Sequence, residues 1–196
     1  MQDSNWLLGD LRVSIDRLDQ AILTLLSERF RVIQKVMELK KTFEIDYQKS
    51  IARNQDIQYL QTFAADMHLG KEFVESLFKM LLDESMNIAQ GSLRDTDYSV
   101  IELDLNSLQG SLKHVELSLL LVLAERFSVV KSIGKLKAEK GLPALDQKRW
   151  ESLMEQKRDQ ARDLNLPMVF VERLFTKIHS EALRLEEAEN KKEKYA

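Results

Sequence analysis

Apolar residues recur with helical spacing, at i, i+3, i+4 and i+7, over two long stretches, residues 10–42 and 105–140. Each stretch predicts one long helix. Shorter periodic stretches predict four more helices, over residues 49–66, 71–90, 146–163 and 167–189. Three residues mark boundaries, since Gly141 is suited to end a helix, Asp146 to cap the next one and Pro167 to a first turn. The pattern predicts an all-α fold.

The second half of this pattern repeats the first. Glu28-Arg29-Phe30 returns as Glu125-Arg126-Phe127, 97 positions later, and Phe73-Val74-Glu75 returns as Phe170-Val171-Glu172 at the same offset. A repeat of this length is a duplicated half-domain rather than a solenoid unit. A helix of about 33 residues spans roughly 50 Å, which its own two short partners cannot cover. We therefore expect two fused three-helix modules that form an intramolecular pseudo-dimer, a helical bundle.

The polar stretch from residue 91 to residue 104 is the expected connector between the modules. The predicted organisation is a first module over residues 1–95, a connector over 96–103, a second module over 104–190 and a charged tail over 191–196. Glu193 stands among the lysines of this tail, Lys191, Lys192 and Lys194, which indicates a charged frayed end rather than a nucleic-acid contact.

The composition supports long helices and narrows the function classes. Six Gly and two Pro are few for 196 residues, and zero Cys excludes disulfides and thiol chemistry. The net charge of −3 gives no general attraction to nucleic acid or to an anionic membrane. The chain start has no signal-peptide pattern, and no apolar run reaches the roughly 18 residues that span a bilayer. We therefore expect a cytoplasmic protein. The three His lack the spacing of metal ligands, so we expect no metal, and we expect no other cofactor.

Cations interrupt the apolar rows of both long helices. Arg29 lies between Leu26 and Val32, and Lys40 follows it by eleven residues, which returns to nearly the same helix face. Arg126 and Lys137 repeat this spacing. An inward cation is costly unless an anion pairs with it, so each belongs either to an internal salt bridge or to a site for an anionic ligand between helices. The repetition of both residues favours the ligand.

Arg12 differs from these cations in its direction. It precedes Arg29 by seventeen residues, which turns it about 100° around the helix, away from the face of Arg29. It can reach a pocket of the other half if the two long helices are antiparallel.

Several motifs agree together. They are Leu11-Arg12-x-x-Ile15-Asp16-x-Leu18-Asp19, Leu25-Leu26-x-Glu28-Arg29 followed by Lys40, and Phe73-Val74-Glu75-x-Leu77-Phe78 followed by Glu84-Ser85. Each half of the chain resembles the all-helical chorismate mutase family almost from end to end. Leu142-Pro143-x-x-Asp146-x-x-Arg149 is similar to the loop and second-helix start of that family. The resemblance implies an interlocked dimer in which a first-helix Arg enters the site of the other module, here Arg12.

The resemblance also implies a chemistry that explains the cations. Chorismate is a dicarboxylate that rearranges to prephenate in one pericyclic step, without a nucleophile, metal or cofactor. The protein must hold two carboxylates, for which Arg is suited, and must place donors at the ether oxygen. The implied partner is therefore a small dicarboxylate, and the protein is expected as a monomeric pseudo-dimer or a higher homo-oligomer.

Two sites are expected, and the first is degenerate. Site one consists of Arg29, Lys40, Arg53 and Ser85, with Gln109 where the incoming Arg of the family belongs. Ser50, Asn54 and Ala89 replace the loop Asp, the second-helix Glu and the third-helix Gln of the family. We expect this site to be inactive or weakened.

Site two keeps every cation. We expect Arg12, Arg126, Lys137, Asp146, Arg149 and Trp150 to bind substrate, and Lys137, Glu186 and Arg126 to be catalytic. Trp150 replaces the family Glu that meets the substrate hydroxyl, Ala182 replaces a Ser, and Glu186 replaces the Gln that donates to the ether oxygen. A Glu donates only when it is protonated, so we hypothesise that this site works best below neutral pH.

The expected function is thus a chorismate mutase with one competent site. Two alternatives keep the site and change the reaction or substrate: an isochorismate pyruvate lyase, or a mutase acting on aminodeoxychorismate. A third is a non-catalytic protein that binds a dicarboxylate or regulates a partner.

Overall fold

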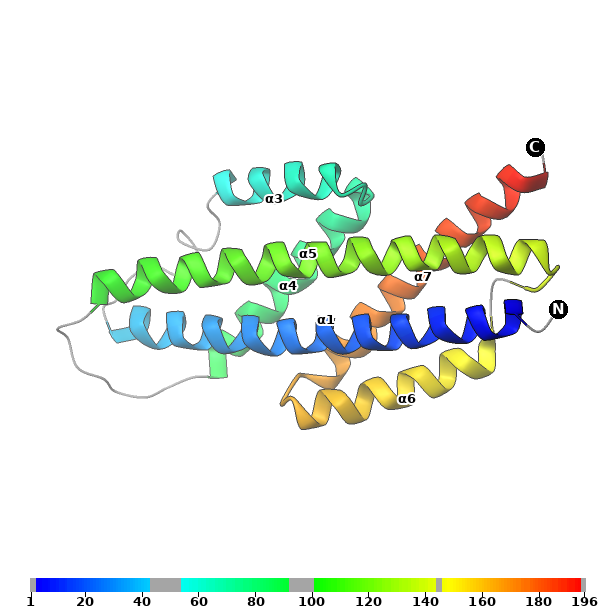
Figure 1. The fold of residues 1–196 in the computed structure, drawn as a ribbon. Coiled ribbons are helices and arrows are strands. Elements are labelled where there is room, and N and C mark those ends of the chain that lie inside the picture. The colour runs from blue at the N-terminus through cyan, green and yellow to red at the C-terminus, as the bar shows by residue number, and fades with distance from the viewer. Residues whose placement is uncertain (1–2, 43–53, 92–100, 144–145, 195–196) are drawn as a thin grey trace. The chain divides into compact units, whose positions relative to one another are not determined.

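A computed structural model describes residues 3–42, 54–91, 101–143 and 146–194 of the chain. Nearly all of these residues are helical, and no strand occurs among them. The helices are α1 (Asp3–Thr42), α3 (Asn54–Asp66), α4 (Lys71–Gly91), α5 (Ile101–Glu139), α6 (Gln147–Asp163) and α7 (Met168–Lys194) (Figure 1). The predicted all-α fold is confirmed.

Three helix ends differ from the prediction. Helix α1 begins at Asp3 and α5 at Ile101, earlier than the periodicity indicates, and α7 continues to Lys194 through most of the expected frayed tail. The extension of α7 is polar, whereas those of α1 and α5 mix polar and apolar residues. None of them contains Pro, and Asp, Asn, Glu and Lys remain compatible with a helix. Polarity alone is therefore a poor marker of a helix end. Residues 49–53 of the predicted second helix lie outside the described residues, and its remainder is α3.

The long helices each contribute to two compact units. The first unit consists of residues 1–24 and 122–196, and the second of residues 25–121. In the first unit the start of α1, from one sequence repeat, accompanies the end of α5 with α6 and α7, from the other repeat. The second unit combines the end of α1, α3 and α4 with the start of α5. This exchange between the repeats is the arrangement that the pseudo-dimer prediction requires.

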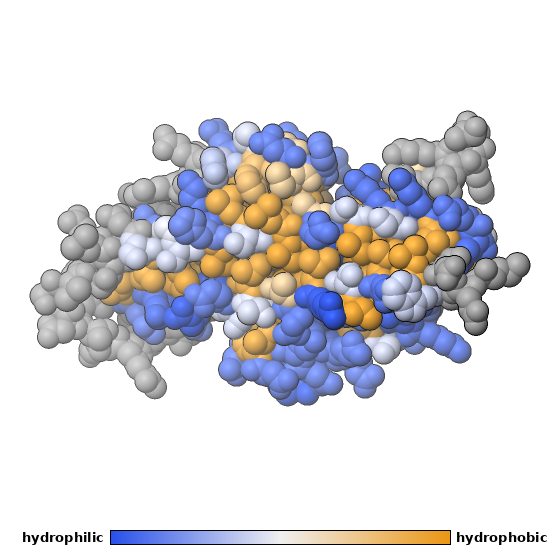
Figure 2. All heavy atoms as spheres, in the orientation of Figure 1, coloured by the Kyte–Doolittle hydropathy of each residue, from blue (hydrophilic) through white to orange (hydrophobic). Residues whose placement is uncertain are grey.

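Helix α6 is positioned by its ends and by one buried row. Asp146 is its N-cap, with a carboxylate that accepts a hydrogen bond from the Arg149 backbone N–H at 3.2 Å, as predicted. Gly141, at φ +63°, ends α5 two residues past Glu139 in the left-handed conformation that glycine favours. The buried row of α6 is Met154, Lys157 and Ala161, at i, i+3 and i+7. The face of α6 seen in Figure 2 is largely hydrophilic.

The core of the first unit is apolar except for a cluster of ionisable residues. Its buried apolar residues include Ile15, Ile22, Leu123, Phe170, Leu174, Phe175 and Ile178. Its buried ionisable residues are Asp19, Arg126, Lys137, Lys157 and Glu186. Buried charge is costly unless it is paired, so this cluster is a candidate functional site. Across the described ranges, no helix has both the length and the apolar character needed to cross a membrane.

Candidate active site

A cavity opens in the first compact unit. Helices α1, α5, α6 and α7 and the Asp146 cap line it with Arg12, Ile15, Arg126, Val130, Ile133, Lys137, Asp146, Arg149, Trp150, Leu153, His179, Ala182 and Glu186. The six residues predicted to bind substrate therefore lie together, with Glu186 and Ala182 beside them. Four of the lining side chains are cations and two are carboxylates, which leaves a net positive charge.

Arg126 is the buried cation that the sequence pattern pointed to. Its side chain is 7% exposed, and its Nε donates to the Asp19 carboxylate at 2.6 Å. Its Nη1 is also buried, yet it has no hydrogen-bond partner among the described residues. A buried donor without an acceptor is unfavourable, and a ligand carboxylate in the cavity supplies that acceptor. Of the two interpretations of Arg126, the salt bridge is present and one donor remains for an anion.

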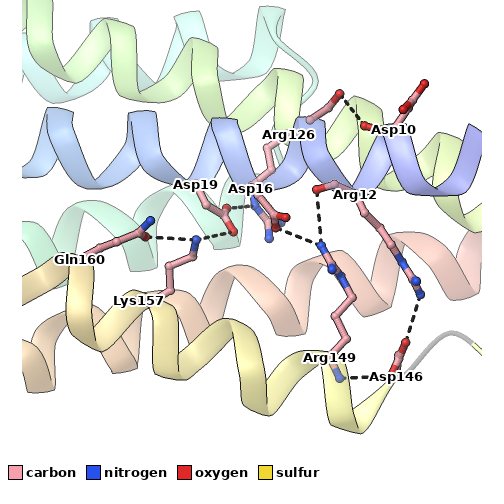
Figure 3. A network of polar contacts seen from close by, with 10 residues as sticks. Asp10, Arg12, Asp16, Asp19, Arg126, Asp146, Arg149, Lys157 and Gln160 are labelled. Carbon is pink, nitrogen blue, oxygen red and sulfur yellow. Dashed lines mark hydrogen bonds and ion pairs between the residues drawn. The ribbon is translucent and has the colours of Figure 1, made fainter.

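Lys157 is a second buried cation beside Asp19, and the sequence analysis missed it. Its Nζ lies 3.5 Å from Asp19 Oδ2 and 3.5 Å from the Gln160 side chain (Figure 3). The side chain is 2% exposed, with Nζ 5.5 Å from the centre of the Phe175 ring. The helical spacing from Met154 to Ala161 was the available signal, because it places residue 157 on the inward face. Two cations thus share one carboxylate.

Lys137 and Glu186 form a third buried pair. The Lys137 Nζ lies 2.8 Å from Glu186 Oε2, and each side chain is 9% exposed. Burial raises the pKa of the Glu186 carboxyl, against the opposing hydrogen bond from Lys137 and the charges of Lys137, Arg126 and Arg12. Glu186 therefore stays protonated to a higher pH than an exposed glutamate does.

Gly134 allows α5 to approach α7 at Glu186. A Cβ atom on Gly134 would lie 3.2 Å from the Glu186 Cα and 3.4 Å from its Cγ. The corresponding positions of the first repeat, 97 residues earlier, are Met37 and Ala89. On α7 the second repeat has the larger residue, Glu186 where the first repeat has Ala89. On α5 it has the smaller residue, Gly134 where the first repeat has Met37.

Arg12 and Arg149 occupy the more exposed part of the cavity. Arg12 pairs with Asp146 at 3.1 Å, and Arg149 pairs with Asp16 at 3.0 Å (Figure 3). The side chains of Arg12 and Arg149 are 33% and 30% exposed. Ion pairs at this exposure are weak, so a ligand carboxylate can replace either partner at little cost. Arg12 comes from α1 and Arg149 from α6, and both line the cavity. Arg12 belongs to the first repeat, so it reaches a cavity that is formed mainly by the second repeat, as predicted for antiparallel long helices.

Trp150 and His179 form an aromatic wall of the cavity. Their ring centroids are 4.0 Å apart and their planes differ by 9°. The His179 Nε2 atom is buried and has no hydrogen-bond partner in the described parts of the chain. Burial, and then the charges of Arg126 and Lys137, lower the pKa of the His179 imidazole. The sequence analysis set this histidine aside, although residues 179, 182 and 186 share one helix face.

The comparison with protein families fits this geometry. The family model of chorismate mutase type II matches the chain twice, over residues 11–90 and 108–187. The chain belongs to the chorismate mutase type II family. No curated protein and no solved structure matches it significantly. The two matches fall on the two sequence repeats, and the cavity combines Arg12 from the first chorismate mutase segment with residues of the second.

In the second compact unit the corresponding arginine, Arg29, is engaged by residues of the same unit. The Arg29 Nε and Nη2 lie 3.0 Å from Glu116 Oε1, and its Nη1 donates to Ser85 Oγ at 2.7 Å and to the Leu81 carbonyl at 3.3 Å. Arg29 is therefore engaged in the internal salt bridge that was one of its two interpretations. Gln109 lies half-buried on α5, whereas Arg53 and the side chain of Lys40 lie outside the described residues. Of the predicted site-one residues, Arg29 and Ser85 are brought together.

A metal site is not part of this arrangement. Among the residues that the structure describes, no group of three or more His, Asp or Glu side chains is placed to hold a metal ion.

Proposed function

We propose that the cavity of the first compact unit is a chorismate mutase active site that converts chorismate to prephenate. The observation that carries the proposal is the buried Arg126 Nη1, an unsatisfied cationic donor in a cavity with three further cations. Four cations against two carboxylates complement a dianion. The apolar side chains of Ile15, Val130, Ile133 and Leu153 suit the body of a small ring compound.

The rearrangement breaks a C–O bond and forms a C–C bond within one molecule. Arg12, Arg126 and Arg149 hold the two carboxylates so that the bound substrate keeps its reactive conformation. The entropy needed to orient the substrate is then lost on binding and not in the transition state. Lys137 and a protonated Glu186 donate to the ether oxygen, where negative charge develops in the transition state. The raised pKa of Glu186 supports this donor role, because a carboxylate can only accept.

The second compact unit is proposed to be structural. Its Arg29 already donates to Glu116, Ser85 and a backbone carbonyl, so no donor corresponds to the unpaired Nη1 of Arg126. One active site per chain follows.

The aromatic wall favours a second candidate, in which the same cavity acts on a relative of chorismate. Trp150 lies at the position that the family uses for a Glu facing the substrate hydroxyl, and it is stacked on His179. Isochorismate, with loss of pyruvate, and aminodeoxychorismate are the substrates that keep both carboxylates and change the ring.

The test is disappearance of chorismate between about pH 5 and pH 8, in the parent protein and in Arg126→Ala. We expect turnover in the parent and a loss of about 100-fold or more in the variant, since a buried donor to a substrate carboxylate is removed. Arg31→Ala is the matched control, because Arg31 pairs with Glu28 on an exposed surface. Turnover that Arg126→Ala leaves intact would place the site elsewhere. An inactive parent would direct the same assay to isochorismate and aminodeoxychorismate.

A further inference from the structure

We propose that His179, held flat against Trp150, forms a hydrogen bond with the ring hydroxyl group of the ligand and so determines which ring substituent the cavity accepts. The inference rests on the cavity of the proposed function but not on the reaction. It assigns His179 as a specificity-determining residue, in contact with the substrate.

The stack fixes where the imidazole points. Trp150 comes from α6 and His179 from α7, two helices that pack on one another in the first compact unit. A centroid separation of 4.0 Å with planes 9° apart leaves the imidazole little freedom to tilt. The His179 side chain lines the cavity, and its Nε2 is buried and lacks a partner among the described residues. A buried polar atom in this situation is unfavourable unless a ligand completes its hydrogen bond.

The charge state of His179 indicates which group completes that bond. The pKa of the imidazole is lowered by burial, with Arg126 and Lys137 adding to the effect, so the ring is neutral near neutral pH. A neutral imidazole nitrogen either donates or accepts, depending on the tautomer. A hydroxyl group fits both cases, whereas a carboxylate fits only a donor. The carboxylates of the ligand are better bound by Arg12, Arg126 and Arg149.

The remaining lining argues for a ring. A flat aromatic wall and four aliphatic side chains suit an unsaturated carbocycle, and an extended chain diacid gains less from them. The first repeat has Leu82 at the position of His179, 97 residues earlier, so the histidine is particular to the half that forms this cavity.

The experiment compares two ligands, chorismate and its deoxy analogue lacking the ring hydroxyl. The chain has two tryptophans, and Trp6 is 71% exposed, so Trp6→Phe leaves Trp150 as the single reporter in the cavity wall. Rapid-mixing fluorescence in this background gives a dissociation constant for each ligand before appreciable turnover. The variants are His179→Leu and His179→Gln. His114→Leu, at an exposed histidine of the other unit, is the matched control.

We expect His179→Leu to weaken chorismate binding about 10-fold and to change binding of the deoxy analogue by less than about 2-fold. His179→Gln, which keeps a donor and an acceptor, recovers most of the chorismate affinity. His114→Leu changes neither constant. Equal weakening for both ligands would reduce His179 to a packing role and overturn the inference, as would unchanged binding of both or no binding of chorismate at millimolar concentration. Chorismate that is bound tightly but recovered unchanged refutes the proposed reaction and leaves this inference standing.

Discussion

Arg126 and Asp19 form a buried ion pair at 2.6 Å, and the pair reappears with its partners exchanged as Arg29 and Glu116. Residue 126 corresponds to 29 and residue 116 to 19 at the repeat offset of 97, so each pair joins the two repeats within its own compact unit. The copies differ in what surrounds the guanidinium. Arg29 also donates to Ser85 and to a backbone carbonyl, whereas Arg126 keeps a buried nitrogen unpaired within the described structure. In the second unit the guanidinium nitrogens therefore bind within the protein, whereas in the first unit one nitrogen can still bind an anion.

Replacing Arg29 separates a structural role from a catalytic one. Arg29→Met removes a buried cation from Glu116 and is expected to lower the free energy of unfolding by about 3–5 kcal/mol. The double variant Arg29→Met with Glu116→Leu is expected to recover most of that loss, because both buried charges are then gone. Denaturant unfolding of both variants measures the effect. Rates per folded molecule in the double variant should equal those of the parent, and a large drop would make the second unit part of the active site.

Lys157 is a second buried cation beside Asp19, a carboxylate that already has a cationic partner. Arg126 already pairs with Asp19, and the first repeat has the buried Leu60 at the position of Lys157. Lys157→Leu is expected to leave the free energy of unfolding unchanged or to raise it by about 1–2 kcal/mol. The dissociation constant for a dicarboxylate should rise several-fold, because one positive charge is lost near the cavity. A destabilisation above about 3 kcal/mol would instead mean that Asp19 needs both cations.

Much of this fold could be predicted from periodicity, and the failures have physical causes. The 3.6-residue repeat located all six described helices, and the Asp146 cap was confirmed because its short side chain has few alternatives to the first-turn N–H groups. Lys157 escaped because polarity was taken as exposure, although the spacing of its helix turns it inward. His179 escaped because histidines were considered as metal ligands, whereas its environment depends on Trp150, a contact between helices that spacing along one helix does not show.

Arg12 should matter for catalysis and not for stability. Its pair with Asp146 joins side chains that are 33% and 43% exposed, and such pairs contribute little. Arg12→Ala is expected to change the free energy of unfolding by less than about 0.5 kcal/mol and to lower kcat/KM about 100-fold, because a carboxylate loses its clamp. Steady-state kinetics and thermal unfolding on one preparation give both values. If stability and rate fell together, the arginine would be a structural element of the unit.

Gly134 offers a test of helix spacing with an internal control. A Cβ at this position meets the Glu186 backbone at 3.2 Å, so Gly134→Ala must displace α7 or α5 by a few tenths of an ångström. Alanine also raises helix propensity by about 1 kcal/mol, so we expect little net change in stability but a loss of rate of about 10-fold as Glu186 moves. Gly110→Ala on the same helix meets nothing within 4 Å. That control should stabilise α5 without changing the rate. Equal rates for the two variants would show that the helix spacing at Gly134 does not affect the reaction.

The protonation of Glu186 sets the direction of the pH dependence. Its pKa is raised, chiefly by burial, so the folded protein holds this proton to a higher pH than the unfolded chain does. The buried carboxylate therefore lowers stability above its folded pKa, and this loss is relieved as the pH falls through it. The proposed donor is present only in the protonated form, so kcat/KM should rise over the same window as the pH falls.

Glu186→Gln keeps a donor at every pH. Its profile should be flat between about pH 5 and pH 8, and its rate at about pH 7.5 should exceed that of the parent. His179 also lines the cavity, and burial lowers its pKa, so its protonation requires a more acid pH than that of an exposed imidazole. His179→Leu should therefore retain the slope that Glu186→Gln removes. A Gln variant that is slower than the parent at neutral pH, or that keeps the slope, would show that Glu186 does not deliver the hydrogen bond to the ether oxygen.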